Sequence, residues 1–143
     1  MVPEHHAIFC FAVAFDQRHR ERGVRAAAVH PVGIQTELDR YLDPGVIEQM
    51  IKQINESAAA AGKEPFRFKT IPQGAATTVW AAVVALAAEI GRKYCEDCHL
   101  SQIVPEDATT GIMSGGVRAY AVDAKNATAL WKKCEEMLGE SFD

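Results

Sequence analysis

The chain has 143 residues, of which 48% are hydrophobic and 24% are charged, so it has enough apolar side chains for the core of one domain. Its net charge is -4, and its lysines and arginines are scattered, which excludes the basic stripe that binds nucleic acid or an anionic membrane surface. The longest apolar runs, residues 7–15 and 79–88, are shorter than the roughly 20 residues of a membrane-spanning helix. The first six residues lack the layout of a signal peptide, so we expect a cytoplasmic protein with four reduced cysteines.

The first elements in chain order are a helix and a strand. Residues 7–23 are apolar first and charged afterwards, and they end at Gly23, which predicts a helix closed by a left-handed glycine. Residues 24–30 are almost wholly apolar, as in a parallel strand covered on both faces. A helix, a one-residue turn and a strand in this order are typical of an α/β protein.

Two more helices are predicted in the middle of the chain. Asp43 is a candidate N-cap with Pro44 as the first helical residue, and Thr70 with Gln73 forms a capping-box pattern. The second of these helices is expected to end near Glu89. The first carries an apolar stripe at helical spacing, made of Val46, Ile47, Met50, Ile51 and Ile54.

The last third of the chain is predicted as a turn with a short strand over residues 91–100, a loop over 101–116 and a final helix capped by Asp123. We interpret Trp80 and Trp131 as core residues on apolar helical faces. The apolar face of the final helix is formed by Ala127, Leu130, Trp131, Cys134, Met137 and Leu138.

Three motifs suggest chemistry, but each has a simpler interpretation. Residues 95–99, CEDCH, match a haem-attachment pattern and could form half of a zinc site, but no second cysteine pair accompanies them. Residues 110–116, TGIMSGG, nearly spell a dinucleotide-binding loop, but a polar segment precedes them where a buried strand is required. Glu4, His5 and His6 lie at a chain end and do not share a helical face. We expect no metal site.

The segment 28–38, AVHPVGIQTEL, is the most informative. Its strand leads to the carboxyl edge of a sheet, where α/β proteins bind ligands. Pro31 and Gly33 force a turn there, and Thr36 adds a hydroxyl that can hydrogen-bond an amide or a phosphate. A plain strand-to-helix turn remains the alternative interpretation.

This segment resembles the short-chain dehydrogenases/reductases, near their retinol-dehydrogenase-like and WW-domain-oxidoreductase-like branch. The resemblance continues through residues 73–83, 91–98 and 120–139. It implies the C-terminal part of a Rossmann-type doubly wound parallel sheet, mostly helical with about two short parallel strands. It also implies that a loop holds the nicotinamide end of NAD or NADP through Pro31, Val32, Gly33, Ile34 and Thr36.

The resemblance further implies a hydrophobic alcohol or carbonyl substrate near Leu38 and Tyr41, with residues 38–44 and a helix over 46–54 as the substrate lid. Val32 stands where the family usually has glycine, so we expect its β-branched side chain to crowd the cofactor or to forbid the positive φ that glycine permits. The family's catalytic tyrosine and lysine correspond to Met1 and His5, and Tyr120 with Lys125 misses the required spacing by one residue.

We therefore predict one partial domain over residues 1–143 without catalytic residues of its own. The chain would be an oxidoreductase-family polypeptide that is inactive alone. The alternative is a non-catalytic α/β module that associates with itself or with a partner through exposed apolar helices and an open sheet edge.

Overall fold

The computed structural model describes residues 4–41, 43–108 and 115–142, and in residues 4–6, 38 and 39 it describes only the backbone. The helices are α1 (Glu4–His19), α2 (Pro44–Ala60), α3 (Ile71–Val79), α4 (Ala87–Ile90) and α5 (Ala124–Leu138). The strands are β1 (Ala28–His30), β2 (Tyr94–Glu96), β3 (His99–Leu100), β4 (Ile103–Val104) and β5 (Val117–Arg118). Short helical turns lie at η1 (Arg20–Arg22), η2 (Glu37–Tyr41), η3 (Trp80–Val84) and η4 (Ala119–Val122).

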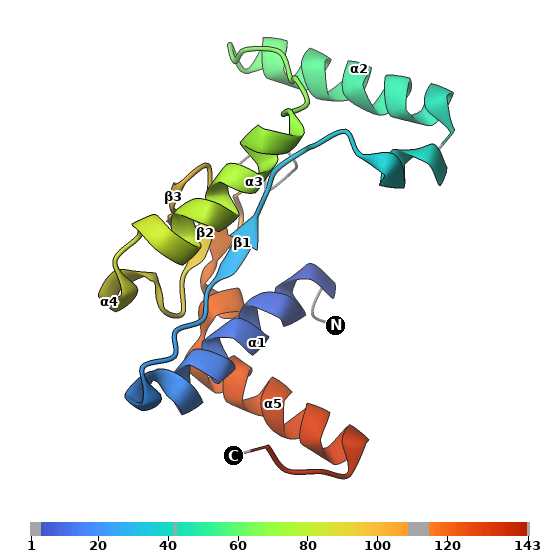
Figure 1. Ribbon diagram of the computed structural model, residues 1–143. Helices are drawn as coiled ribbons and strands as arrows, with labels where there is room; N and C mark the ends of the chain where they lie inside the picture. The colour runs from blue at the N-terminus through green and yellow to red at the C-terminus, as the bar shows by residue number, and fades with distance from the viewer. Residues whose placement is uncertain (1–3, 42, 109–114, 143) are drawn as a thin grey trace.

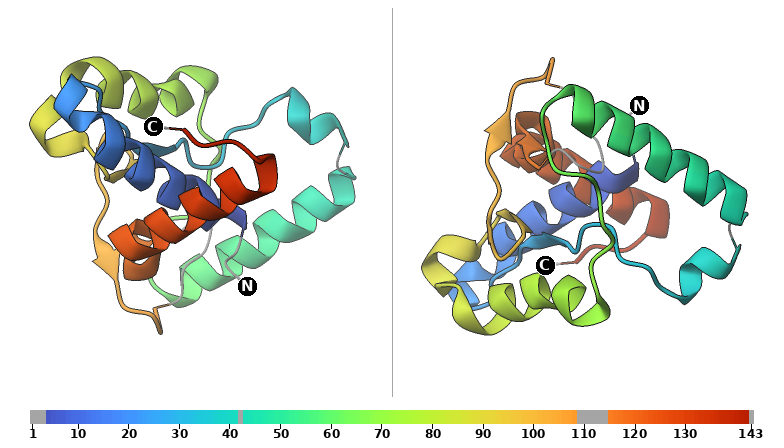
Figure 2. Two further views of the ribbon diagram at one scale, coloured as in Figure 1. Left: turned by 90° about the horizontal axis from the view of Figure 1, so that it is seen from below. Right: turned by 90° about the horizontal axis from the view of Figure 1, so that it is seen from above.

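The central feature is a small open sheet between two helical layers. β1 runs parallel to β2, with Val29 opposite Cys95, and β2 pairs with β3 in antiparallel orientation. Helix α3 lies on one side of these strands, and α1 and α5 lie on the other (Figures 1 and 2). β4 and β5 form a separate parallel pair. This arrangement confirms the expected α/β class and the expected pair of short parallel strands.

Helices α1 and α5 pack against each other and form the larger apolar cluster. Cys10, Val13 and Ala14 of α1 contact Ala127 and Trp131 of α5, and all five are buried. The expectation that Trp131 belongs to the core is therefore confirmed.

A second cluster joins α1 to the sheet. Ala12 packs with Ala28 of β1, Tyr94 of β2, Val117 of β5 and Ala121 of η4. One helix thus serves both clusters, which places α1 at the centre of the apolar packing.

Helix α2 stands apart from these layers, at the opposite end of the molecule from α5 (Figure 1). Asn55 of α2 accepts a hydrogen bond from the Phe66 N–H over 2.7 Å, which ties the helix to the chain that leads into α3. Val46 at the start of its apolar stripe is 60% exposed. The stripe is therefore incompletely covered within the described residues.

The three predicted helix caps are all present. Asp43 accepts the Gly45 N–H over 2.7 Å, and Asp123 accepts the N–H groups of Lys125 and Asn126. At the start of α3, the capping box has both of its reciprocal hydrogen bonds, between Thr70 and Gln73. Each cap satisfies N–H groups that the first helical turn leaves without an intrahelical partner.

Several element boundaries differ from the prediction. The strand expected over residues 24–30 is regular only from Ala28 to His30, and the expected single strand over 91–100 is a β2–β3 hairpin. The segment expected to be a loop over residues 101–116 contributes β4, which pairs with Val117 and Arg118 of β5. The helix expected to end near Glu89 is interrupted at Ala85, whose ψ of 145° is extended. Trp80, expected in the core, is only half-buried.

None of the helices in the described part of the chain has both the length and the apolar character needed to cross a bilayer.

Candidate functional site

Residues 31–36 leave the carboxyl end of β1, beside the carboxyl end of its parallel neighbour β2. This is the edge at which open α/β sheets bind ligands. The structure therefore places the loop where the sequence predicted it. The register sets His30 opposite Glu96, so the loop begins level with the last residue of β2.

The backbone of the loop turns at Val32, whose φ is 64°. This left-handed conformation is uncommon for any residue with a side chain, and for a β-branched one it is a genuine outlier. We expected that the valine would forbid a positive φ, and that expectation was wrong. The next residue, Gly33, is held by a hydrogen bond from the Lys69 N–H to its carbonyl, and the backbone adopts the glycine-like turn despite the side chain of Val32.

Gly33 and Ile34 anchor the loop to the chain before α3. A Cβ on Gly33 would lie 2.7 Å from Cζ of Phe66, so a larger residue would force the buried Phe66 ring to shift. The Gly33 carbonyl accepts the Lys69 N–H over 2.9 Å, and Ile34 forms a parallel β-bridge with Lys69. The inner side of the loop is thereby filled by protein.

The outer side of the loop carries its exposed residues. Pro31, Gln35 and Thr36 are exposed, while Val32 and Gly33 are half-buried. Exposed peptide groups and a hydroxyl supply both hydrogen-bond donors and acceptors. The loop therefore offers hydrogen-bonding groups on the side that faces solvent.

The residues predicted to contact substrate lie beyond the loop, in η2. Tyr41 is 72% exposed, and the guanidinium of Arg40 stacks over its ring at 4.6 Å. The side chain of Leu38 is outside the described part of the structure. Figure 1 shows η2 next to α2 and away from the sheet.

The CEDCH motif forms a tight hairpin. Asp97 and Cys98 have φ values of 46° and 58°, the pair of positive angles that a two-residue β-turn of type I′ requires. Cys95 is fully buried in β2, and burial raises the pKa of its thiol, whereas Cys98 is exposed. No group of three or more potential metal ligands occurs among the residues that the structure describes.

Glu96 at the end of β2 is a buried acid that the sequence analysis did not single out. One oxygen of its carboxylate, Oε1, accepts the Ser101 hydroxyl at 2.7 Å and the Gly116 N–H at 2.8 Å. A Cβ on Gly115 would lie 2.7 Å from the same oxygen. Glu96 therefore holds the chain before β5 against the carboxyl end of the sheet.

Tyr94 lies two residues before Glu96 in β2. Its ring packs against Phe9 of α1, with ring centroids 4.6 Å apart, and lies 6.2 Å from the ring of His30. Burial, assisted by the nearby charge of Glu96, raises the pKa of Tyr94 to about 12. The phenol thus stays protonated at neutral pH and acts as a core group.

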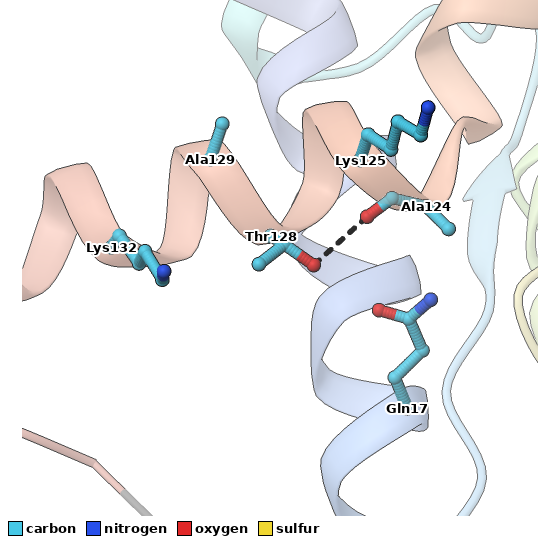
Figure 3. Close-up of a pocket in the computed structure, with 6 residues that line it drawn as sticks. All are labelled: Gln17, Ala124, Lys125, Thr128, Ala129 and Lys132. Atoms are coloured by element: carbon cyan, nitrogen blue, oxygen red, sulfur yellow. Dashed lines mark hydrogen bonds between the residues drawn. The ribbon is translucent and has the colours of Figure 1, made fainter.

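Hollows lined by described residues lie elsewhere, and the two given next include no residue of the loop. One, of about 470 Å³, opens between α1 and α5, where Gln17 faces the first turns of α5 (Figure 3). The Thr128 hydroxyl there donates to the Ala124 carbonyl of its own helix, over 2.9 Å. The other, of about 260 Å³, lies between Val13 of α1 and Tyr94 of β2.

Some predictions fall on residues that the structure does not describe. Met1 and most of the TGIMSGG segment are outside the described ranges, as are the side chains of Glu4, His5 and His6. In the described part, the loop gains two supports that sequence reasoning missed, Phe66 and Lys69. The sequence feature that could have indicated these supports is the alternation of aromatic and basic residues over 66–69, just before the cap of α3.

The chain is similar over most of its length to proteins named as oxidoreductases. It is 32% identical over 123 residues to short-chain dehydrogenase/reductase prx1 of Penicillium rubens, which covers 86% of this chain and 33% of that protein. It is 32% identical over 111 residues to a probable oxidoreductase of Streptomyces lividans, covering 77% of this chain and 35% of that protein. Oxidoreductase calI of Penicillium decumbens is 28% identical over 134 residues, or 93% of this chain and 37% of that protein.

The chain thus spans about a third of the length of the curated relatives that it matches. No protein-family model matches the chain, and no solved structure matches it significantly.

Proposed function

We propose that this chain is part of a short-chain dehydrogenase/reductase and that residues 31–36 hold the nicotinamide end of NAD(P). One observation supports this most directly: the loop leaves the carboxyl end of a parallel strand, in a chain 32% identical to a protein named as such an enzyme. When bound, NAD(P)H supplies a hydride for the reduction of a carbonyl carbon. The substrate class we propose is a hydrophobic alcohol or carbonyl.

Each residue of the loop has a separate task in this proposal. Pro31 sets the direction of the chain after β1, and Val32 provides the left-handed turn. Gly33 and Ile34 fix the inner side against Phe66 and α3. Thr36 presents a hydroxyl on the exposed side, where it can hydrogen-bond the carboxamide.

Substrate contacts are proposed for Leu38 and Tyr41 in η2, with α2 as part of a covering lid. The exposed ring of Tyr41 and the incompletely covered stripe of α2 would gain apolar contacts on closing over a hydrophobic substrate. We assign no catalytic acid or base to this chain.

The test is a titration of the purified chain with NADH and NADPH, followed by cofactor fluorescence. Thr36→Val removes the hydroxyl while keeping the shape, and we expect it to weaken cofactor binding by about tenfold, the worth of one hydrogen bond of roughly 1.4 kcal/mol. Thr78→Val, at an exposed position on α3, is the matched control. Absence of any response from either cofactor would contradict the proposed site.

A second candidate function is that of a self-associating module, and exposed apolar residues at the end of η3 and just after it favour it. Val83, Val84 and Leu86 are 75%, 64% and 64% exposed, within four residues of one another. Contiguous exposed apolar side chains are typical of association surfaces. Light scattering measures the molar mass of the chain in solution. If the parent chain self-associates, the double variant Val83→Lys/Leu86→Lys should have a lower molar mass. A monomeric parent chain would exclude this function.

A further inference from the structure

Lys69 makes two contacts that connect the candidate cofactor loop to the neighbouring strand. Its backbone N–H donates to the Gly33 carbonyl over 2.9 Å, in the middle of the loop. Its ammonium forms an ion pair with Oδ1 of Asp97, in the β2–β3 turn. One residue therefore reaches from the loop after β1 to the turn after β2.

The surroundings show that this connection joins three elements at one edge of the sheet. The Cys98 N–H, next to Asp97, donates to the Thr77 hydroxyl of α3 over 3.3 Å. Ile34 of the loop covers Gly74 of the same helix. Helix α3 thus contacts both the loop and the hairpin, and Lys69 links the loop to the hairpin through its backbone N–H and its ion pair with Asp97.

The two partners are covered to different degrees. The side chain of Lys69 is 25% exposed and that of Asp97 is 55% exposed. Partly exposed ion pairs contribute little to global stability. The backbone N–H of the same lysine bonds the Gly33 carbonyl, one residue after the left-handed turn at Val32, so the ion pair acts on a residue that holds this turn.

From these contacts, we propose that Lys69 is a positioning residue, which holds the cofactor loop in its binding conformation by anchoring it to Asp97. The expected effect on cofactor affinity rests on the proposed function. The effect of Lys69 on the position of the loop can be tested without cofactor. Lys69 does not contact the nicotinamide in this proposal. It acts through the Gly33 carbonyl.

The test compares hydrogen exchange at the Lys69 amide in the full chain and in Asp97→Asn. This variant removes the charge and leaves residue 69 unchanged, and asparagine adopts positive φ readily, so the hairpin turn is retained. We expect the Lys69 amide to exchange roughly twofold to fivefold faster, the range that corresponds to a partly exposed ion pair. Amides of α5 should be unaffected, and Asp107→Asn, at an exposed position outside the loop and the hairpin, is the matched control.

A conservative variant separates positioning from general damage. Lys69→Arg keeps the charge and should retain the slow exchange of the amide at position 69, whereas Lys69→Met should lose it. An unchanged protection factor at position 69 in both Asp97→Asn and Lys69→Met would overturn the positioning role.

Cofactor titration supplies the second readout. NADH affinity should fall roughly twofold to fivefold in Asp97→Asn and remain unchanged in Asp107→Asn. If the parent chain binds no NADH, the proposed function fails, while the exchange rate still decides the role of Lys69 in holding the loop. If exchange accelerates and affinity is unchanged, the link between loop position and binding is overturned.

Discussion

The side chain of Ile34 occupies the space above Gly74 of α3. A Cβ built on Gly74 would lie 1.9 Å from Cδ1 of Ile34. The candidate cofactor loop therefore packs against α3 at a position where only the missing side chain of Gly74 leaves room for Ile34. A glycine in the middle of a helix lowers helix stability by about 1 kcal/mol relative to alanine.

This contact predicts that Gly74→Ala destabilises the chain, although alanine is the better helix former. The added methyl group forces Ile34 or the loop to move, at a cost of about 1–3 kcal/mol. The measurement is the free energy of unfolding in urea. In a double-mutant cycle, Ile34→Ala should make Gly74→Ala far less harmful, and additive effects of the two substitutions would contradict the proposed contact.

The backbone conformation of Val32 predicts that glycine at this position gives a more stable chain than alanine. Its φ of 64° costs a residue with a Cβ about 1–2 kcal/mol relative to a right-handed conformation, and glycine escapes that cost. Val32→Gly should therefore be about 1 kcal/mol more stable than Val32→Ala. Thermal unfolding of the two variants checks the ranking, and a more stable alanine variant would show that position 32 is not left-handed in solution.

Asp16 predicts how stability changes in acid. Its carboxylate is fully buried and accepts hydrogen bonds from Nε of Arg25 at 2.9 Å and from the Ala26 N–H at 3.0 Å. Burial alone would raise the pKa of Asp16, but the Arg25 and Ala26 hydrogen bonds and the charges of Arg25 and Arg92 outweigh it and hold this pKa below the ordinary value of 3.8.

Because the folded chain favours the ionised carboxylate, the stability that Asp16 contributes is present above pH 3.8 and is lost as the pH falls through the lower folded-state pKa. Asp16→Asn should lower the free energy of unfolding by roughly 2 kcal/mol at neutral pH. It should also reduce the loss of stability at acid pH. Urea unfolding at a series of pH values measures both effects. Glu48→Gln, at an exposed position on α2, should leave them unchanged.

Tyr94 predicts the behaviour in alkali. Burial raises the pKa of this phenol from 10.0 to about 12, so the folded chain favours its neutral form. Stability that depends on Tyr94 is therefore complete below pH 10 and is lost as the pH rises towards 12. Tyr94→Phe should remove the last ionisation step in an ultraviolet difference titration. Tyr41→Phe, at an exposed position, should leave that step in place.

Local signals in the sequence were sufficient for the helix ends. Gly23 closes the first helical segment in the left-handed conformation, with φ 79°, and Thr70 with Gln73 starts α3 as a capping box. These features depend on residues at most four positions apart, so their geometry follows from backbone hydrogen bonding alone. The position of the loop after β1 was predictable for the same reason, because an apolar strand was followed directly by proline and glycine.

Long-range pairing was not predictable in this way. Residues 101–116 resemble a loop by composition, yet Ile103 pairs with Val117 and forms a short parallel ladder. The break in the predicted helix at Ala85 has no glycine or proline to mark it. In both places tertiary contacts override weak local preferences, which is common for short segments.

The sequence by itself determined the main helices, the strand at Ala28–His30, the helix caps and the position of the loop after that strand. Only the tertiary structure decided that Phe66, Lys69 and Gly74 hold this loop and that Glu96 fixes the chain at Gly116. The physical reason is the separation along the sequence between the interacting residues. Caps and turns are set by neighbouring backbone groups, whereas the supports of the loop are separated from it by more than thirty residues and meet it only when the sheet and α3 pack together.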